Sequence, residues 1–324
     1  MIKQILPFLL LFVVFSSCNR KVAPVTTLAD ERDYSPTLTD TSLLWSVTGK
    51  GLAEPSYVFG TIHIIPEKDY FLPNHVVKAL NSAEEVVFEI DPRDMQDMAA
   101  IMGLMTKMNM KKGVTLDDLL SEEDYALVKE YFKKNGMPLF MVKRMKPMFL
   151  STMVGQEGGL GGMAPGENPL DGANLNGSKS YEFELTELAE AAGKEISGLE
   201  TMDFQLGLFD SIPYEAQAQM LVEAIKATEL AEEGDGEDPM AVMIDMYRRQ
   251  AVAEMSSMIG EDSGMGEYEE ILLIKRNRNW IPQIVAGTSD GPRFYAVGAG
   301  HLGGREGVIA LLRREGYTVE PVYR

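Results

Sequence analysis

The sequence predicts an α/β (α+β) fold, with a mostly parallel central sheet built from N- and C-terminal βαβ units and a large helical insert. Three observations lead to this prediction. A strand-like run, a helical run and a second strand-like run occur near the start of the domain, and the same order returns near its end. Between them lies a long stretch with helical patterning. Strand, helix and strand in this order are typical of parallel pairing.

The first 17 residues are a targeting segment and are not expected to belong to the fold. A lysine at position 3 precedes an apolar run and two serines. This is the pattern of a secretory signal, and it is too short for a convincing membrane span. Its end, "FSSC", resembles a bacterial lipobox, in which Cys18 is lipidated and becomes the mature N-terminus. The alternative is an ordinary cleaved signal with a cysteine there by chance.

Residues 18–41 are polar, contain proline and show no period, so they suit a flexible tether. The folded domain is expected over 42–324. A lipid at Cys18 would hold it at the cell envelope, facing the periplasm or the exterior. The net charge of −19 argues against nucleic acid as a partner, since phosphates call for a basic face.

The opening unit of the domain follows the segment "SLLWSVTG". Residues 55–64 ("PSYVFGTIHI") are rich in β-branched and aromatic residues, which predicts a strand that runs into a turn at Gly60. Residues 72–83 predict a short helix with Asn74 as its N-cap. Residues 84–91 ("EEVVFEID") predict the second strand.

The middle of the domain, about 94–265, is expected to be the helical insert, with a helix that stops at Gly193 and a short strand after it. Residues 155–178 are rich in Gly, Asn and Pro and predict a long loop, which is either a lid over a site or a surface insertion. Four methionines spaced by three and four share one helix face, either as a core stripe or as a pliable peptide groove: Met95, Met98, Met102 and Met105.

The closing unit mirrors the opening one. A helix over 268–287 precedes a strand at 294–298 ("FYAVG"), and a turn with His301 leads to a helix and a last strand over 317–323. An apolar run, a glycine, two residues and a histidine therefore occur twice, as "GTIH" and "GAGH".

Ligands of an open parallel sheet bind beyond the carboxyl ends of its strands. His63, Glu89 and His301 lie at or just past such ends. Two neutral imidazoles and a carboxylate are a common divalent-metal set with an open position for water. Such a water loses its proton near neutral pH and attacks a carbonyl. The alternative for each histidine is a hydrogen-bonded turn residue, and no HExxH or GxSxG motif is present.

Other residues are candidates to complete this site. Arg276 and Asn277 lie on the helix before the last histidine, where an arginine either holds a substrate carboxylate or an oxyanion or belongs to a solvated helix face. Acidic residues near strand and helix ends are candidate outer partners or substrate contacts, and glycines allow close backbone approach: Asp91, Glu182, Glu200, Gly60, Gly298 and Gly300.

The segments "YVFGTIHI", "EEVVFEID", "GKEISGLET..FQ", "RNRNW" and "YAVGAGHLGG" occur in this order. In this combination the chain resembles the TraB/GumN family, the TraB/PrgY/TIKI-type metalloproteases, from about residue 43 to 323. The resemblance implies a fold related to erythromycin esterases and haem-binding ChaN proteins. It also implies a metal-dependent peptidase that acts on a peptide or protein with a divalent metal, Mn, Co or Zn.

The resemblance also implies residue roles. His63 and His301 would be metal ligands and Glu89 the third ligand or a general base, whereas Arg276 and Asn277 would orient the substrate and stabilise the oxyanion. The chain departs from the family pattern at "SYEFE", where Glu182 stands at the place of the aspartate in "G.D".

Two functions are therefore expected. The first is a membrane-tethered metal-dependent hydrolase, which requires His63, Glu89 and His301 to converge on one point. The second is a non-catalytic lipoprotein that sequesters a peptide or haem, with the histidines ligating haem iron.

Overall fold

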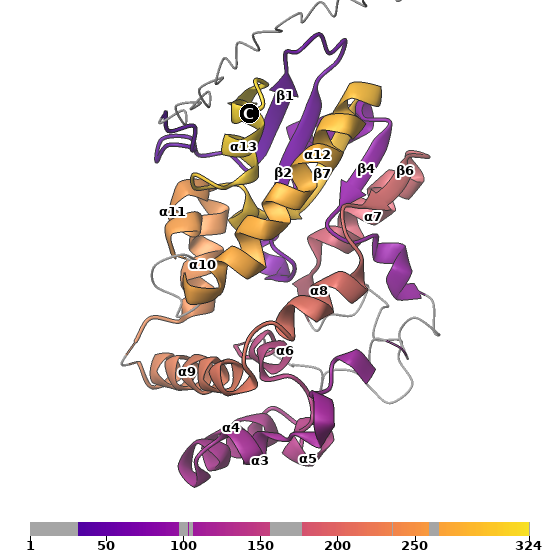
Figure 1. Cartoon of the computed structure of the whole chain (residues 1–324). Coiled ribbons are helices and arrows are strands. Elements are labelled where there is room, and N and C mark those ends of the chain that lie inside the picture. The colour runs from indigo at the N-terminus through magenta and orange to yellow at the C-terminus, as the bar shows by residue number, and fades with distance from the viewer. Residues whose placement is uncertain are drawn as a thin grey trace, which may run out of the picture. The chain divides into compact units, whose positions relative to one another are not determined.

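The computed structural model of the chain describes residues 32–96, 103, 106–155, 177–234, 236–258 and 266–323. These residues form an α/β fold over a six-stranded sheet of order β6-β4-β7-β2-β1-β8 (Figure 1). Neighbours among β6 (Glu195–Gly198), β4 (Glu85–Phe88), β7 (Arg293–Gly298) and β2 (Ser56–Thr61) run parallel. β1 (Leu44–Thr48) is antiparallel to both β2 and β8 (Thr318–Pro321). The predicted mostly parallel sheet is therefore confirmed.

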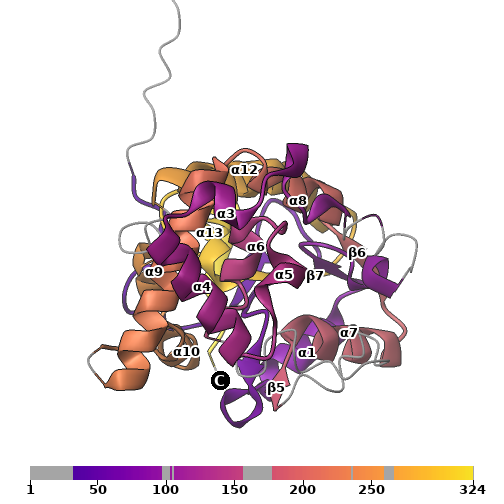
Figure 2. The same cartoon turned by 90° about the horizontal axis from the view of Figure 1, so that it is seen from below.

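Strands from the two ends of the chain lie side by side in this sheet. β2 and β7 pair in register, with Gly60 opposite Val297 and Thr61 opposite Gly298. Their carboxyl ends therefore bring the two GxxH segments to one edge. Figure 2 shows α12 (Lys275–Asp290) on one side of the sheet and α1 (Asn74–Ser82) with α7 (Tyr181–Ala191) on the other. Burial of apolar side chains on both faces is expected for a parallel sheet covered in this way.

Two local predictions are corrected by the structure. Gly60 lies inside β2 and the turn follows the strand, because the glycine serves close packing and not a change of chain direction. A Cβ atom at Gly60 would lie 2.7 Å from Leu302 Cδ1 and 3.1 Å from Ala299 Cα. The second correction is at α1, which begins at Asn74 with Pro73 at the N-cap position, since proline suits the extended backbone there.

The expected helical stretch over 94–265 is interrupted by β6, which forms an edge of the main sheet. α7 ends before Gly193, which takes the left-handed conformation (φ +65°) that lets the chain turn into β6. Two further short strands, β3 (Ile65–Pro66) and β5 (Ser178–Lys179), pair with each other. Three methionines of the expected stripe (Met98, Met102 and Met105) lie outside the described residues, as do most of the long loop (156–176), Cys18 and the signal segment.

α13 (Val308–Arg314) lies alongside α12 and β8, whereas the other helices lie largely beyond the carboxyl ends of the strands (Figures 1 and 2). A second apolar cluster there includes Val128, Leu150 and Leu221. None of the helices in the described ranges is long and apolar enough to cross a bilayer. The helices are α3 (Leu116–Leu119), α4 (Glu122–Lys134), α5 (Leu139–Val142), α6 (Pro147–Ser151), α8 (Met202–Phe209), α9 (Tyr214–Glu233), α10 (Pro239–Arg248), α11 (Val252–Ser257) and α13 (Val308–Arg314).

A buried lysine joins the second cluster to the helix that follows β6. Lys146 precedes α6 and is 1% exposed, and its Nζ donates to the Leu206 carbonyl at 3.0 Å and lies 2.9 Å from Asp210 Oδ1. Because a buried charge needs such partners, this contact fixes α8 relative to α6.

Replacing Gly60 by alanine should lower the free energy of unfolding by about 1–3 kcal/mol, because the added methyl group meets the backbone of Ala299. The matched control is Gly207→Ala on α8, where an added Cβ would meet nothing within 4 Å. The control should be neutral or stabilising by up to about 1 kcal/mol. Urea unfolding of both variants tests this. Equal midpoints for the two variants would show that β2 does not need the glycine.

Candidate active site

Five strand and helix ends meet at the carboxyl edge of the sheet. Glu89 directly follows β4, and His301 closes the short 3₁₀ turn η8 (Ala299–His301) after β7. Glu200 follows β6. The start of α12 supplies Arg276 and Asn277, directly after a π-helical turn, η7 (Glu270–Ile274). His63 follows β2.

Glu89 is held between the end of β7 and the His301 turn. Its Oε1 accepts the Gly298 N–H at 2.7 Å and lies 3.6 Å from His301 Nε2. A Cβ atom at Gly298 would lie 3.2 Å from this oxygen, so the glycine allows the carboxylate to approach the backbone closely. Glu89 is 8% exposed.

Arg276 lies at the centre of the cluster. Its Nη2 donates to Glu89 Oε2 and, at 2.6 Å, to Glu200 Oε1, while Nε donates to the same Glu200 oxygen at 2.9 Å. Its Nη1 lies 3.0 Å from His301 Nε2. One guanidinium therefore contacts both buried carboxylates and the imidazole, which its planar set of donors allows.

Asn277 sets the tautomer of His301. The Asn277 Nδ2 group donates to the Glu306 carbonyl at 2.8 Å, so its Oδ1 faces His301 Nδ1, at 2.6 Å. The hydrogen-bond network thus assigns the proton to Nδ1 and leaves the Nε2 lone pair toward Arg276 and Glu89. The Trp280 ring packs against the imidazole with centroids 4.5 Å apart.

Protonation states follow from burial and charge. Burial lowers the pKa of His301 to about 3, and the Arg276 charge acts in the same direction, so the imidazole is neutral above that pH. Burial acts to raise the pKa of Glu89, but its neighbours His301 and Arg276 lower it to about 2. Because His301 is neutral near pH 7, Arg276 is the cation that keeps Glu89 ionised there.

His63 forms a separate pair with Glu182. Its Nδ1 lies 3.1 Å from Glu182 Oε1, and that carboxylate also accepts from the hydroxyls of Thr61 and Ser180 at 3.0 Å each. The Glu182 charge and hydrogen bond raise the pKa of His63 to about 9. The His63 side chain is 73% exposed, so solvent weakens this effect.

The structure brings some predicted residues together and leaves others apart. Glu89, Glu200, Arg276, Asn277 and His301 form one contact network, whereas His63 and Glu182 contact each other. Asp91 turns away to Arg93, with its Oδ2 2.6 Å from Nη2. Within the described ranges, no three His, Cys, Asp or Glu side chains are grouped so that they could hold a metal ion.

The donor types nevertheless fit a divalent cation. Each site histidine has its Nδ1 beside an oxygen, which leaves Nε2 as the atom that would ligate, in His63 once it has lost its proton; this is the usual arrangement of metal-bound histidines. Glu89 is ionised and neighbours one of these nitrogens. The obstacle is Arg276, whose Nη1 contacts the lone pair of His301 that a metal would use.

Two residues of this network were not assigned from the sequence. Gln205 Nε2 donates to Glu89 Oε2 at 3.0 Å and to Glu200 Oε1 at 2.8 Å, and Trp280 Nε1 donates to Glu200 Oε2 at 3.0 Å. A signal for Trp280 exists, because it follows Arg276 by four residues and so shares its helix face. For Gln205 the signal was its place in "GLET..FQ".

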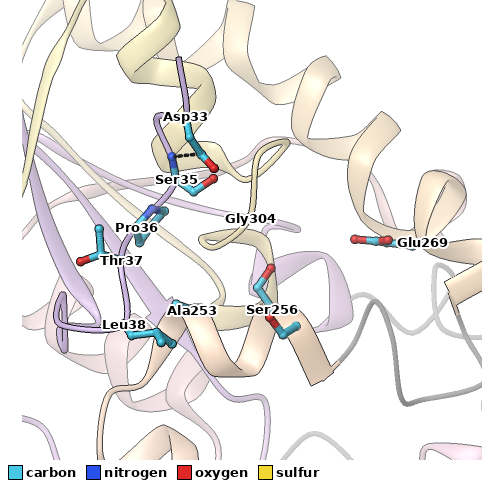
Figure 3. Close-up of a pocket in the computed structure, with 10 residues that line it drawn as sticks. Asp33, Ser35, Pro36, Thr37, Leu38, Ala253, Ser256, Glu269 and Gly304 are labelled. Atoms are coloured by element: carbon cyan, nitrogen blue, oxygen red, sulfur yellow. Dashed lines mark hydrogen bonds between the residues drawn. The ribbon is translucent and has the colours of Figure 1, made fainter. Parts of the chain in front are cut away.

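Two cavities share part of their lining near Gly304. A cavity of about 700 Å³ separates Ser35 and Pro36 from Ser256 and Gly304 (Figure 3). It shares Ser256, Glu269 and Gly304 with a smaller cavity of about 210 Å³ that reaches Asn277 and Gly300. Gly300 therefore lines the smaller cavity.

Acid should destabilise the fold through His301. Between pH 6.5 and about 3 the unfolded chain binds a proton at this residue and the folded chain does not, so stability falls as the pH falls. The contribution is at most about 1.4 kcal/mol per pH unit. Urea unfolding between pH 6.5 and 5, with chelator present, should show a shallower pH dependence for His301→Gln than for the wild type. Identical slopes would mean that His301 titrates normally.

Comparison with known proteins identifies relatives of the chain and its family. Metalloprotease TIKI2 of Danio rerio is 23% identical over 330 residues, which cover 86% of this chain and 60% of the relative. Metalloprotease TIKI1 of Homo sapiens is 24% identical over 355 residues, covering 94% of this chain and 66% of the relative. The chain thus spans less than two thirds of the length of these curated relatives. No solved structure gives a significant match. The model of the TraB/PrgY/gumN family matches residues 43–321, so the chain belongs to that family.

Proposed function

We propose that this chain is a metal-dependent hydrolase of the peptidase class. The observation that carries the proposal is the buried cluster of Glu89, Arg276 and His301 at the carboxyl edge of the sheet. A neutral imidazole, an ionised carboxylate and an arginine in one network can supply ligands for a metal and a donor for the oxyanion that forms when an amide is hydrolysed. The names of the curated relatives support the same reaction class.

Each residue has a proposed role. Nε2 of His301, Nε2 of His63 and the Glu89 carboxylate would hold the cation, which is Mn, Co or Zn. When bound, a divalent cation supplies the Lewis acidity that polarises a carbonyl and acidifies water. The low pKa of Glu89 makes it a weak base, so we assign it as a ligand rather than the general base.

The other side chains orient these groups. Glu182 holds Nδ1 of His63, and Asn277 holds Nδ1 of His301. Arg276 has five N–H donors and would stabilise the negative oxygen that forms on the substrate carbonyl. The joined cavities that reach Asn277 would accommodate part of an extended peptide or protein substrate.

The setting of the enzyme is also proposed. A lipid at Cys18 and the tether over 18–41 would hold the domain at a membrane of the cell envelope, facing the periplasm or the exterior. The net charge of −19 argues against nucleic acid as a partner.

The three histidines of the chain offer a matched test. With the full chain and added metal, His63→Ala and His301→Ala should each lower kcat/KM for peptide cleavage by about 100-fold or more, because loss of outer contacts alone costs about 10–100-fold. His75→Gln on α1 is the control and should cleave at the wild-type rate. Elemental analysis should find metal in the wild type and in the control. Absence of metal uptake by the wild type would end the proposal, and a Soret band on haem titration, or bound peptide recovered uncut, would favour a binding lipoprotein.

Asn277→Ala should lower metal affinity about 10–100-fold, because Nδ1 of His301 loses its acceptor and the ring loses its fixed tautomer. Asn279→Ala, an exposed position on the same helix, should bind metal as the wild type does. Equilibrium dialysis of the full chain measures both. Equal affinity in the two variants would show that Asn277 does not orient a metal ligand.

A further inference from the structure

We propose that Arg276 is a competing cation in the metal site: it occupies the ligating face of His301 and the counter-charge position between Glu89 and Glu200, and it releases His301 when metal binds. The inference rests on the metal dependence proposed above and goes beyond it, because it assigns to Arg276 control over metal affinity.

The first observation is the charge balance of the buried cluster. The side chains of Glu89 and Glu200 are 10% and 6% exposed, and that of Arg276 is 10% exposed. Two carboxylates removed from water need a cation, and Arg276 is the cation that contacts both. A divalent ion at Glu89 would supply the same counter-charge, so the ion and the guanidinium compete for the same position.

The second observation is the contact between Arg276 and His301. Because Nδ1 of His301 is held by Asn277, Nε2 is the only nitrogen of this ring that can ligate a metal. Arg276 Nη1 lies 3.0 Å from it. A guanidinium does not lose its proton in proteins, so this N–H and a metal cannot share one lone pair. Metal binding at His301 therefore requires Nη1 to move.

The third observation is a π-helical turn that would allow Nη1 of Arg276 to move. Arg276 follows the π-helical turn η7, in which the Lys275 N–H bonds to the Glu270 carbonyl five residues earlier. A π turn holds one residue more than an α turn, and such turns occur frequently at functional sites. A shift of this turn toward α-helical hydrogen bonding would rotate Arg276 about the helix axis.

The remaining contacts identify what would stay in place. Glu200 accepts from both Nε and Nη2 of Arg276 and is itself fixed by Trp280 Nε1 at 3.0 Å and by Gln205. Nη1 contacts no carboxylate: besides His301, its partner is the Leu272 carbonyl at 3.1 Å, and hydrogen bonds to a neutral group are weaker than those to a carboxylate. Arg276 can thus remain anchored on Glu200 through Nε and Nη2 while Nη1 releases His301.

Removal of the guanidinium should therefore strengthen metal binding. In the full chain, Arg276→Met leaves Glu89 and Glu200 without their cation and exposes Nε2 of His301 to a metal. We expect Mn²⁺ or Zn²⁺, titrated by calorimetry, to bind this variant at least about tenfold more tightly than the wild type, a difference of about 1.4 kcal/mol. Its unfolding midpoint should also rise more on metal addition. Arg278→Met is the matched control, an exposed arginine on the same helix paired with Glu270 and Glu306, and it should bind metal as the wild type does.

A second measurement keeps Arg276 unchanged. The Arg276 guanidinium lies 4.9 Å from the Trp280 ring centroid, and the chain has one other tryptophan, Trp45. In a Trp45→Phe background, metal saturation should change the fluorescence of Trp280 as the guanidinium moves.

The outcomes separate this inference from the proposed function. Metal bound by the wild type, but no more tightly by folded Arg276→Met, overturns the inference and leaves the hydrolase intact. Should Arg276→Met fail to fold, unchanged Trp280 fluorescence at metal saturation overturns it instead. Absence of metal binding by the wild type and every variant overturns both.

Discussion

The rest of the site depends on one guanidinium shared between two carboxylates. Glu89 follows β4, Glu200 follows β6, and Arg276 lies on α12, which covers one face of the sheet. The two ion pairs therefore connect two strands to a covering helix. Breaking a buried ion pair by removing one partner costs about 3–5 kcal/mol, because the other charge is left uncompensated. The same contact sets the charge of Glu89 and occupies one face of His301.

The fold makes this contact possible through strand order. β4 and β7 are neighbours, so Glu89 past the end of β4 meets Gly298 and His301 at the end of β7, although more than 200 positions separate them in the sequence. Gly60 and Gly298 matter for distance and not for turning, since each allows a partner to approach the backbone where a methyl group would not fit easily. The strand order therefore places the site residues near one another, and the two glycines let side chains approach the backbone closely.

Much of the fold and part of the candidate site followed from local signals. Strand, helix and strand patterning predicted the mostly parallel sheet, and Glu89 and His301 were placed together because each follows a strand. The positions of His63 and Asp91 were not predictable in the same way. Both lie near strand ends, yet one side chain turns to Glu182 and the other to Arg93, and side-chain direction after a strand depends on tertiary partners. The contacts of Gln205 are of the same kind, since its partner Glu89 is 116 residues away.

Lys146 has a consequence for how this domain can be divided. Its buried ammonium group bonds to α8 one residue after Gln205, and Gln205 in turn touches both carboxylates beneath Arg276. The side chains of Lys146 and Gln205 therefore connect the helices beyond the sheet to the polar cluster. An exchange of the segment that contains α6 between relatives therefore requires that the incoming segment carry an ammonium group at the place of Lys146.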